Sequence, residues 1–222
     1  MIPWVLLDQA KVPGEDREIR LLQRGSEFTI RLGTAELMNS RRGRSEEALA
    51  RLACLRLRDR SRPAILIGGL GMGFTLRAAL AAVGAEARVV VAELVPAVVA
   101  WAKGPMAAVF GDMLSDGRVH VRVVDVGALI RDGAGRYDAI LLDVDNGPEE
   151  LTAAANDGLY DRRGLNASRA ALRPGGVLAV WSAAPDRGFA ERLRRTAGFR
   201  VEEVTVRAGG ARHVIWLATR VG

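Results

Sequence analysis

The chain has 222 residues, a net charge of +6 and one cysteine, so it can bury a core of its own and cannot form an internal disulfide. It has no apolar run of the roughly 18 residues that span a membrane and no signal-peptide pattern, so we expect a cytoplasmic protein without a membrane partner. Arginines supply nearly all the positive charge but alternate with acidic residues along most predicted helices, which is typical of a solvated surface and argues against nucleic acid as the main partner.

Residues 1–43 predict a small antiparallel β segment that precedes the main domain, residues 44–222. The stretches 18–23 and 27–32 flank Arg24-Gly25-Ser26, which is a hairpin signal. A helix is predicted next, with Ser45 as its N-cap because apolar residues then recur on one helical face.

A glycine turn joins the next predicted strand, 64–67, to a helix over 74–83. Such a turn brings backbone N–H groups close to an anionic ligand. The spacing of Gly69, Gly71 and Gly73 is G-x-G-x-G, whereas dinucleotide-binding turns read G-x-G-x-x-G. We therefore predict that these glycines, together with Met72, contact a nucleoside that lacks a pyrophosphate.

Strands and helices alternate through the rest of the chain, which predicts an α/β, Rossmann-like fold with a mostly parallel sheet. The strands of the middle section are continuous apolar runs, as expected for strands that are covered on both faces. Further strands are predicted at 89–92, 119–124, 137–142 and 177–181, helices at 96–110, 127–131 and 187–196, and an antiparallel C-terminal hairpin at 200–207 and 212–219.

Carboxylates lie at or just after the C-terminal ends of consecutive predicted strands, and ligands of open α/β sheets bind at that edge. We expect Glu93 to accept hydrogen bonds from ribose hydroxyls and Asp125 to accept one from an adenine amino group, with Leu94 and Val126 beside them. Asp125 is alternatively a helix N-cap. S-adenosylmethionine fits this arrangement, with its carboxylate at the glycine turn. The predicted catalytic residues are Asp143, which is alternatively a structural cap, and Asp145, with Asn146 and Glu149 lining the pocket.

The chain resembles the spermidine synthase family, within the class I S-adenosylmethionine-dependent methyltransferase superfamily, from about residue 18 to residue 185. The resemblance is carried by the glycine turn through Thr75-Leu76-Arg77, Ala92-Glu93, Tyr137-Asp-Ala-Ile-Leu-Leu-Asp143, Leu159-Tyr160 and Leu172-Arg-Pro-Gly-Gly-Val-Leu178. It implies a seven-stranded, mostly parallel sheet and a homodimer. It also implies that Glu93 binds the ribose, that Asp125 lies at the adenine and that Asp143 helps to deprotonate the attacking amine.

The sequence departs from the family pattern at the acceptor end. Met72 stands where the family has an Asp, and Ser45-Glu46-Glu47 replaces Tyr-His-Glu, so that only Glu47 matches as a substrate-binding residue. The family's Asp-x-x-Asp-Pro is shortened to Asp143-Val-Asp145-Asn-Gly-Pro148. The three arginines of 41–44 would repel a multiply cationic polyamine near its entrance.

These features predict a transferase that moves a group from an adenosyl-sulfonium donor to a small-molecule nucleophile such as an amine. Such an amine is mostly protonated at neutral pH and needs a base. The absence of an acid at Met72 slightly favours methyl transfer from S-adenosylmethionine. The alternatives are aminopropyl transfer from decarboxylated S-adenosylmethionine, nucleic acid methylation, and a non-catalytic adenosyl-binding module. No metal is expected, because His120 and His213 lack ligand spacing.

Overall fold

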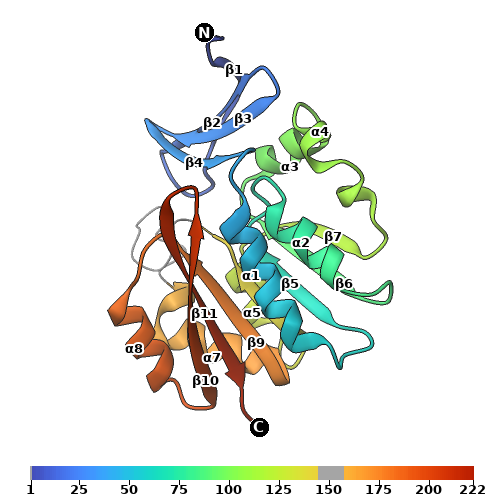
Figure 1. Cartoon of the computed structure of the whole chain (residues 1–222), viewed down its shortest axis with the longest axis vertical. Helices are drawn as coiled ribbons and strands as arrows, with labels where there is room; N and C mark the ends of the chain where they lie inside the picture. Colours follow the sequence, from blue (N-terminus) through green and yellow to red (C-terminus); the bar gives the residue numbers. More distant parts are fainter. Residues whose placement is uncertain (1, 145–157) are drawn as a thin grey trace.

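A four-stranded antiparallel sheet and a larger seven-stranded sheet form the framework of the chain (Figure 1). The structure is a computed structural model that describes residues 2–144 and 158–222. The smaller sheet has the order β1-β2-β3-β4 and contains the predicted hairpin at its centre. Its strands are β1 (Val5–Lys11), β2 (Glu18–Arg24), β3 (Glu27–Leu32) and β4 (Ala35–Asn39).

The seven-stranded sheet has the order β10-β11-β9-β8-β5-β6-β7. The pairs β5–β6, β6–β7, β5–β8 and β8–β9 are parallel, whereas β11 runs antiparallel to both β9 and β10. This confirms the predicted mostly parallel sheet with its C-terminal hairpin. The strands are β5 (Ala64–Gly68), β6 (Arg88–Glu93), β7 (Val119–Val123), β8 (Tyr137–Leu142), β9 (Leu172–Ser182), β10 (Phe199–Ala208) and β11 (Ala211–Arg220).

The topology places a crevice at the junction of β5 and β8. After β5 the chain continues outward through β6 and β7, and then returns to the other side of β5 to form β8. The connections from these two strands therefore leave the sheet in opposite directions, which opens a crevice beyond their C-terminal ends. The glycine turn follows β5 and Asp143 follows β8, so that both border this crevice.

Helices cover both faces of the large sheet, and the sheet lies between two apolar clusters that form the core. One cluster contains residues of the helices from α1 to α4, and the other contains residues of α5, α7 and α8. The helices are α1 (Arg44–Cys54), α2 (Phe74–Ala82), α3 (Pro96–Lys103), α4 (Ala107–Phe110), α5 (Val126–Arg131), α7 (Arg162–Ala171) and α8 (Arg187–Arg195), with short 3-10 helices at Leu55–Leu57 and Met113–Ser115.

Three local predictions were wrong in detail. The helix predicted over 96–110 is two helices, because Pro105 has no N–H to continue the ladder and restricts the residue before it. The N-cap of α1 is Gly43, and Ser45 lies inside the helix, where its hydroxyl donates to Glu46 Oε2 at 2.6 Å. The strand predicted over 177–181 begins earlier, at Leu172, and includes Gly175 with a φ of 76°.

The small sheet shares its core with the large one. Ile19, Phe28 and Ile30 belong to the same apolar cluster as the buried residues of α1 and α2. At β1, an edge strand of the small sheet, Asp8 Oδ2 accepts a hydrogen bond from the indole Nε1 of Trp101 at 2.7 Å, which ties β1 to α3. These contacts hold the small sheet against the end of the large one, and the division at residue 43 stays a prediction.

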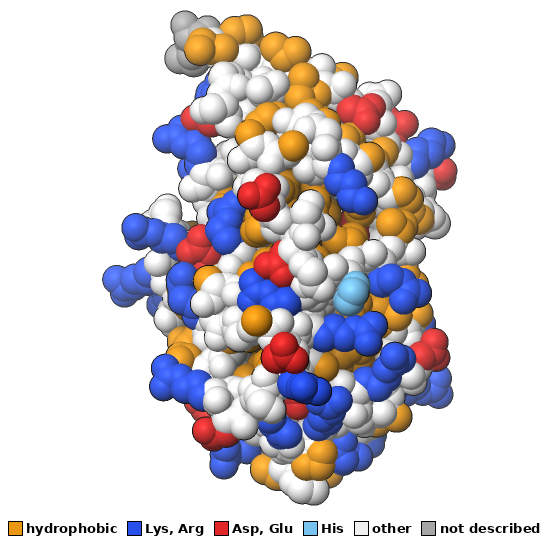
Figure 2. Space-filling view, turned by 90° about the vertical axis from the view of Figure 1, so that its right-hand side faces the viewer, with side chains coloured by type: hydrophobic (Ala, Val, Ile, Leu, Met, Phe, Trp, Pro, Cys, Tyr) orange, Lys and Arg blue, Asp and Glu red, His pale blue; other side chains and the backbone are white. Residues whose placement is uncertain are grey.

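Arginines gather over the lower part of the face in Figure 2, with acidic side chains among them. This mixture agrees with the solvated surface that the sequence indicates, and the question of a nucleic acid partner stays at the level of prediction. The structure is that of one chain, so the homodimer also stays a prediction. Within residues 2–144 and 158–222, no helix is long and apolar enough to cross a membrane.

Candidate functional site

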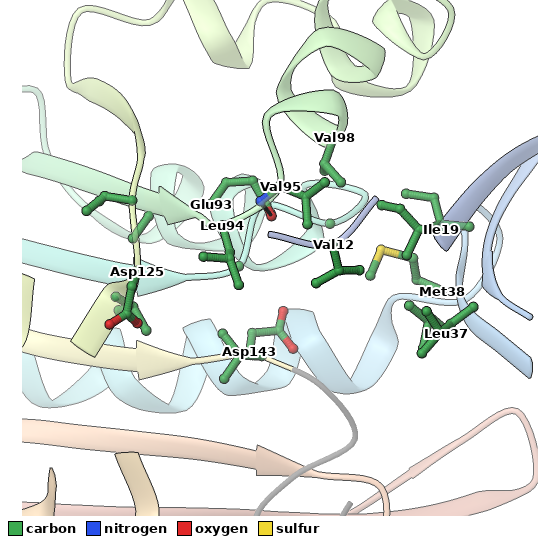
Figure 3. Close-up of a pocket in the computed structure, with 18 residues that line it drawn as sticks. Val12, Ile19, Leu37, Met38, Glu93, Leu94, Val95, Val98, Asp125 and Asp143 are labelled. Atoms are coloured by element: carbon green, nitrogen blue, oxygen red, sulfur yellow. Dashed lines mark hydrogen bonds between the residues drawn. The ribbon is translucent and has the colours of Figure 1, made fainter. Parts of the chain in front are cut away.

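A cavity lies between the small sheet and the C-terminal ends of the parallel strands (Figure 3). It encloses about 890 Å³ of empty space, its open mouth included. Asp125 lies at one end and Leu37 and Met38 of β4 at the other, with Asp143 between them. We call this the first cavity.

The glycine turn borders the first cavity through Gly69 and Gly71, both with positive φ. A side chain on Gly69 would overlap the backbone carbonyl of Asp143, so this position requires glycine. Gly73 begins α2 in the left-handed conformation and packs against Phe110 instead of bordering the cavity. The structure therefore brings two of the three predicted glycines to the site.

Glu93 is buried, and its carboxylate holds the glycine turn in place. Its Oε2 accepts from the backbone N–H of Leu70 at 2.9 Å, and its Oε1 accepts from that of Val95 at 2.8 Å. Burial raises the pKa of Glu93, while the backbone N–H groups act in the opposite direction. The backbone N–H groups of Gly71 and Leu94 also act on this carboxylate, and the predicted bonds to ribose hydroxyls stay a prediction.

Asp125 lines the first cavity and also caps α5, so its alternative role as a helix N-cap is confirmed, and its contact with an adenine stays a prediction. Its Oδ1 accepts from the backbone N–H of Gly127 at 2.9 Å, and Arg131 Nη2 lies 3.3 Å from its Oδ2. Leu94 and Val126 line the same cavity, and their predicted contact with a cofactor stays a prediction.

Asp143 occupies the point where the first cavity meets a second one. Thr75 Oγ1 donates to its Oδ2 at 2.5 Å. Burial, and then the nearby charge of Glu46, raise the pKa of Asp143 from its ordinary value of 3.8 to about 7, against the opposing effect of the Thr75 hydrogen bond. A carboxylate with such a pKa can exchange a proton near neutral pH, which suits a general base.

The second cavity is acidic at one point and otherwise mostly apolar. Its charged residues are Glu46 and Asp143, and its remaining lining is Leu37, Met38, Leu70, Gly71, Met72, Phe74 and Trp181. Met72 thus lines the second cavity and not the first, and its predicted contact with a donor stays a prediction. The indole of Trp181 stacks on His213 with ring centroids 5.2 Å apart.

The sequence predicts Glu47 as a substrate-binding residue, but the structure brings Glu46 and not Glu47 to the second cavity. Glu47 pairs with Arg51 on the outer side of α1, at 3.1 Å, and lines neither cavity. Helical periodicity contains the missed signal, because Glu46 lies three and four residues before the buried Leu49 and Ala50. Thr75 was missed as a partner of Asp143, since its role depends on the packing of α2 against β8.

The predicted residues Asp145, Asn146 and Glu149 lie outside the described residues. Within the described part of the chain, no group of three His, Cys, Asp or Glu side chains is arranged to hold a metal ion. The buried Cys54 has its pKa raised to about 11 by burial, which leaves it a neutral thiol.

No family model and no curated protein matches the sequence. Among solved structures, the spermidine synthase from Thermotoga maritima superposes with a TM-score of 0.75 and 16% identity, over 96% of this chain and 72% of that one. A spermidine synthase in complex with the transition state analogue AdoDATO gives the same values. A probable spermidine synthase from Corynebacterium glutamicum gives a TM-score of 0.63 and 17% identity, over 97% and 79% of the two chains.

Proposed function

We propose that the chain is a transferase that moves the aminopropyl group of decarboxylated S-adenosylmethionine to an amine. Its fold is that of the spermidine synthases on which it superposes. The observation that carries this proposal is the position of Asp143 between the two cavities, with Glu46 beside it in the second.

The donor would lie along the first cavity. Its adenine would be near Asp125, its ribose near Glu93 and its sulfonium beside Asp143, so that the aminopropyl tail passes Gly71 into the second cavity. This order follows the cavity from the capped end of α5 to Leu37 and Met38 (Figure 3).

The charges around the cavities support the aminopropyl donor over the methyl donor. The described linings contain four carboxylates, those of Glu46, Glu93, Asp125 and Asp143, and no Arg, Lys or His. Decarboxylated S-adenosylmethionine carries a sulfonium and an ammonium group, whereas S-adenosylmethionine adds a carboxylate that these acids would repel. The carboxylate of Glu46 supplies the negative charge that would pair with the ammonium of the donor's tail, which Met72 cannot supply. The slight preference for methyl transfer drawn from Met72 is thus not supported.

The proposed chemistry uses the chain mainly to align two reactants and to accept one proton. Asp143 takes a proton from the acceptor's ammonium group, and the freed nitrogen lone pair attacks the carbon next to the sulfonium. A C–N bond forms as the C–S bond breaks, and methylthioadenosine leaves with the bonding electron pair on sulfur. Glu46 holds the positive tail, and Thr75 keeps Asp143 in position.

Product analysis with each donor tests this proposal. The protein is incubated with decarboxylated S-adenosylmethionine or S-adenosylmethionine and a panel of amines. We expect methylthioadenosine from the first donor, and its loss in Asp143→Asn. S-adenosylhomocysteine from the second donor would show methyl transfer instead. The absence of both products across the panel would contradict group transfer altogether.

A further inference from the structure

We propose that the second cavity binds a monoamine whose body is apolar, and that it discriminates against diamines and polyamines. This inference rests on the proposed function, since it concerns the acceptor of the same reaction. It follows from how charge is distributed in the second cavity, and from what lies at its edge.

Glu46 and Asp143 both line the second cavity, and Thr75 contacts both residues. Thr75 Oγ1 donates to Asp143 Oδ2 at 2.5 Å and lies 3.3 Å from the backbone carbonyl oxygen of Glu46. The charge of Glu46 is also the second cause of the raised pKa of Asp143. These acids therefore form one anionic corner between α1, α2 and the end of β8.

Two positive groups meet in this corner during aminopropyl transfer. One is the ammonium of the donor tail, and the other is the acceptor nitrogen before Asp143 takes its proton. Two carboxylates match these two charges. A second ammonium on the acceptor would find no further carboxylate among the described residues that line this cavity.

The rest of the cavity suits hydrocarbon. Met72 and Trp181 are buried at 2% and 8% exposure, and Leu37, Leu70 and Phe74 complete the wall. An ammonium held against such side chains loses its hydration without gaining a partner, which is strongly unfavourable. An alkyl or aryl body gains contact with the same surface.

Arginines lie next to this wall. Gly43 packs directly on the ring of Phe74, so the segment that carries Arg42 and Arg44 runs beside the cavity. Both side chains belong to exposed residues, and neither has an ion-pair partner within the described ranges. Arg77 also lies over the Phe74 ring, 5.5 Å from its centroid. These cations oppose a second positive charge on the acceptor.

Calorimetry tests the inference apart from turnover, with the protein saturated by 5′-deoxy-5′-(3-aminopropylthio)adenosine, a thioether that keeps the ammonium tail of the donor and cannot transfer it. We expect hexylamine and phenethylamine to bind at least about tenfold more tightly than 1,4-diaminobutane at pH 8. Equal or tighter binding of the diamine, or no binding of any amine, would overturn the inference. Methylthioadenosine release from the decarboxylated donor is measured in parallel. Its absence while monoamines still bind would overturn the proposed function alone.

A pair of variants tests the physical cause. Leu37 is half-buried on β4, so a polar side chain there can be accommodated. Leu37→Glu adds a carboxylate to the apolar wall and should tighten diamine binding about tenfold, whereas the isosteric Leu37→Gln should not. Thermal melts check that both variants remain folded. If both variants gain equally, or Leu37→Glu gains nothing, missing charge does not set the selectivity.

Discussion

Replacing Asp143 by asparagine should stabilise the fold while it removes activity. The pKa of Asp143 is raised from its ordinary value of 3.8 to about 7, so the folded protein binds a proton more tightly there than the unfolded chain does. A raised pKa for an acid means that stability is lost as the pH rises from about 4 to about 7. The ionised carboxylate of Asp143 therefore destabilises the folded protein above pH 7, whereas the neutral asparagine of the variant does not.

The size of the effect follows from the shift. A pKa that moves from 3.8 to about 7 corresponds to at most about 4 kcal/mol. Asp143 keeps partial contact with the open cavity, so solvent screens the charge and we expect about 2 kcal/mol. Asparagine can still accept the hydrogen bond of the Thr75 hydroxyl. The stabilisation should appear at pH 8 and vanish near pH 4.

Urea unfolding of both proteins at pH 4, 6 and 8 measures this difference. Thr75→Val is a useful companion, because it removes the hydrogen bond and leaves the carboxylate in place. The reasoning is refuted if Asp143→Asn is no more stable than the wild type at pH 8, or if the difference between them does not depend on pH.

Further predictions address Glu46, Glu93 and Asp8. In pH–rate profiles, kcat/KM should rise with pH through about 7 as Asp143 ionises. Glu46→Gln should move this rise to lower pH because it removes a like charge, whereas Glu47→Gln should leave the rise in place. A shift produced by Glu47→Gln would contradict this assignment. Glu93→Ala should lower the free energy of unfolding by about 2 kcal/mol, since the N–H groups of Leu70 and Val95 lose their acceptor. The same variant should bind the donor more than tenfold more weakly in calorimetry, and an unchanged donor affinity would show that Glu93 is not part of the site. Asp8→Ala should raise the Kd of the donor about fivefold, because the small sheet loses its tie to Trp101, and an unchanged Kd would show that this tie does not shape the cavity.

The sequence predicted the large sheet, and three of the carboxylates that it placed at strand ends line the first cavity, although their binding roles stay predictions. Continuous apolar runs identify parallel strands whatever their order, and the glycine turn has a local signature. The acids Glu93, Asp125 and Asp143 follow from one rule, that loops after parallel strands meet at one edge. Their detailed contacts are less predictable, because the clamp by Glu93 depends on the path of the turn after Gly69.

The lining of the second cavity was harder to predict. Matching positions to a family motif selected Glu47, whereas the face of α1 that packs inward selects Glu46. The contribution of Leu37 and Met38 depends on how the small sheet docks, and strand patterns contain no information on that docking. The pairing of Thr75 with Asp143 joins residues 68 positions apart and follows only from the packed fold.

The most direct test of the account is a calorimetric titration of the protein with decarboxylated S-adenosylmethionine. The account predicts saturable binding at one site per chain, weakened by Glu93→Ala and stronger than the binding of S-adenosylmethionine. No binding of either compound, or binding that Glu93→Ala leaves unchanged, would contradict it.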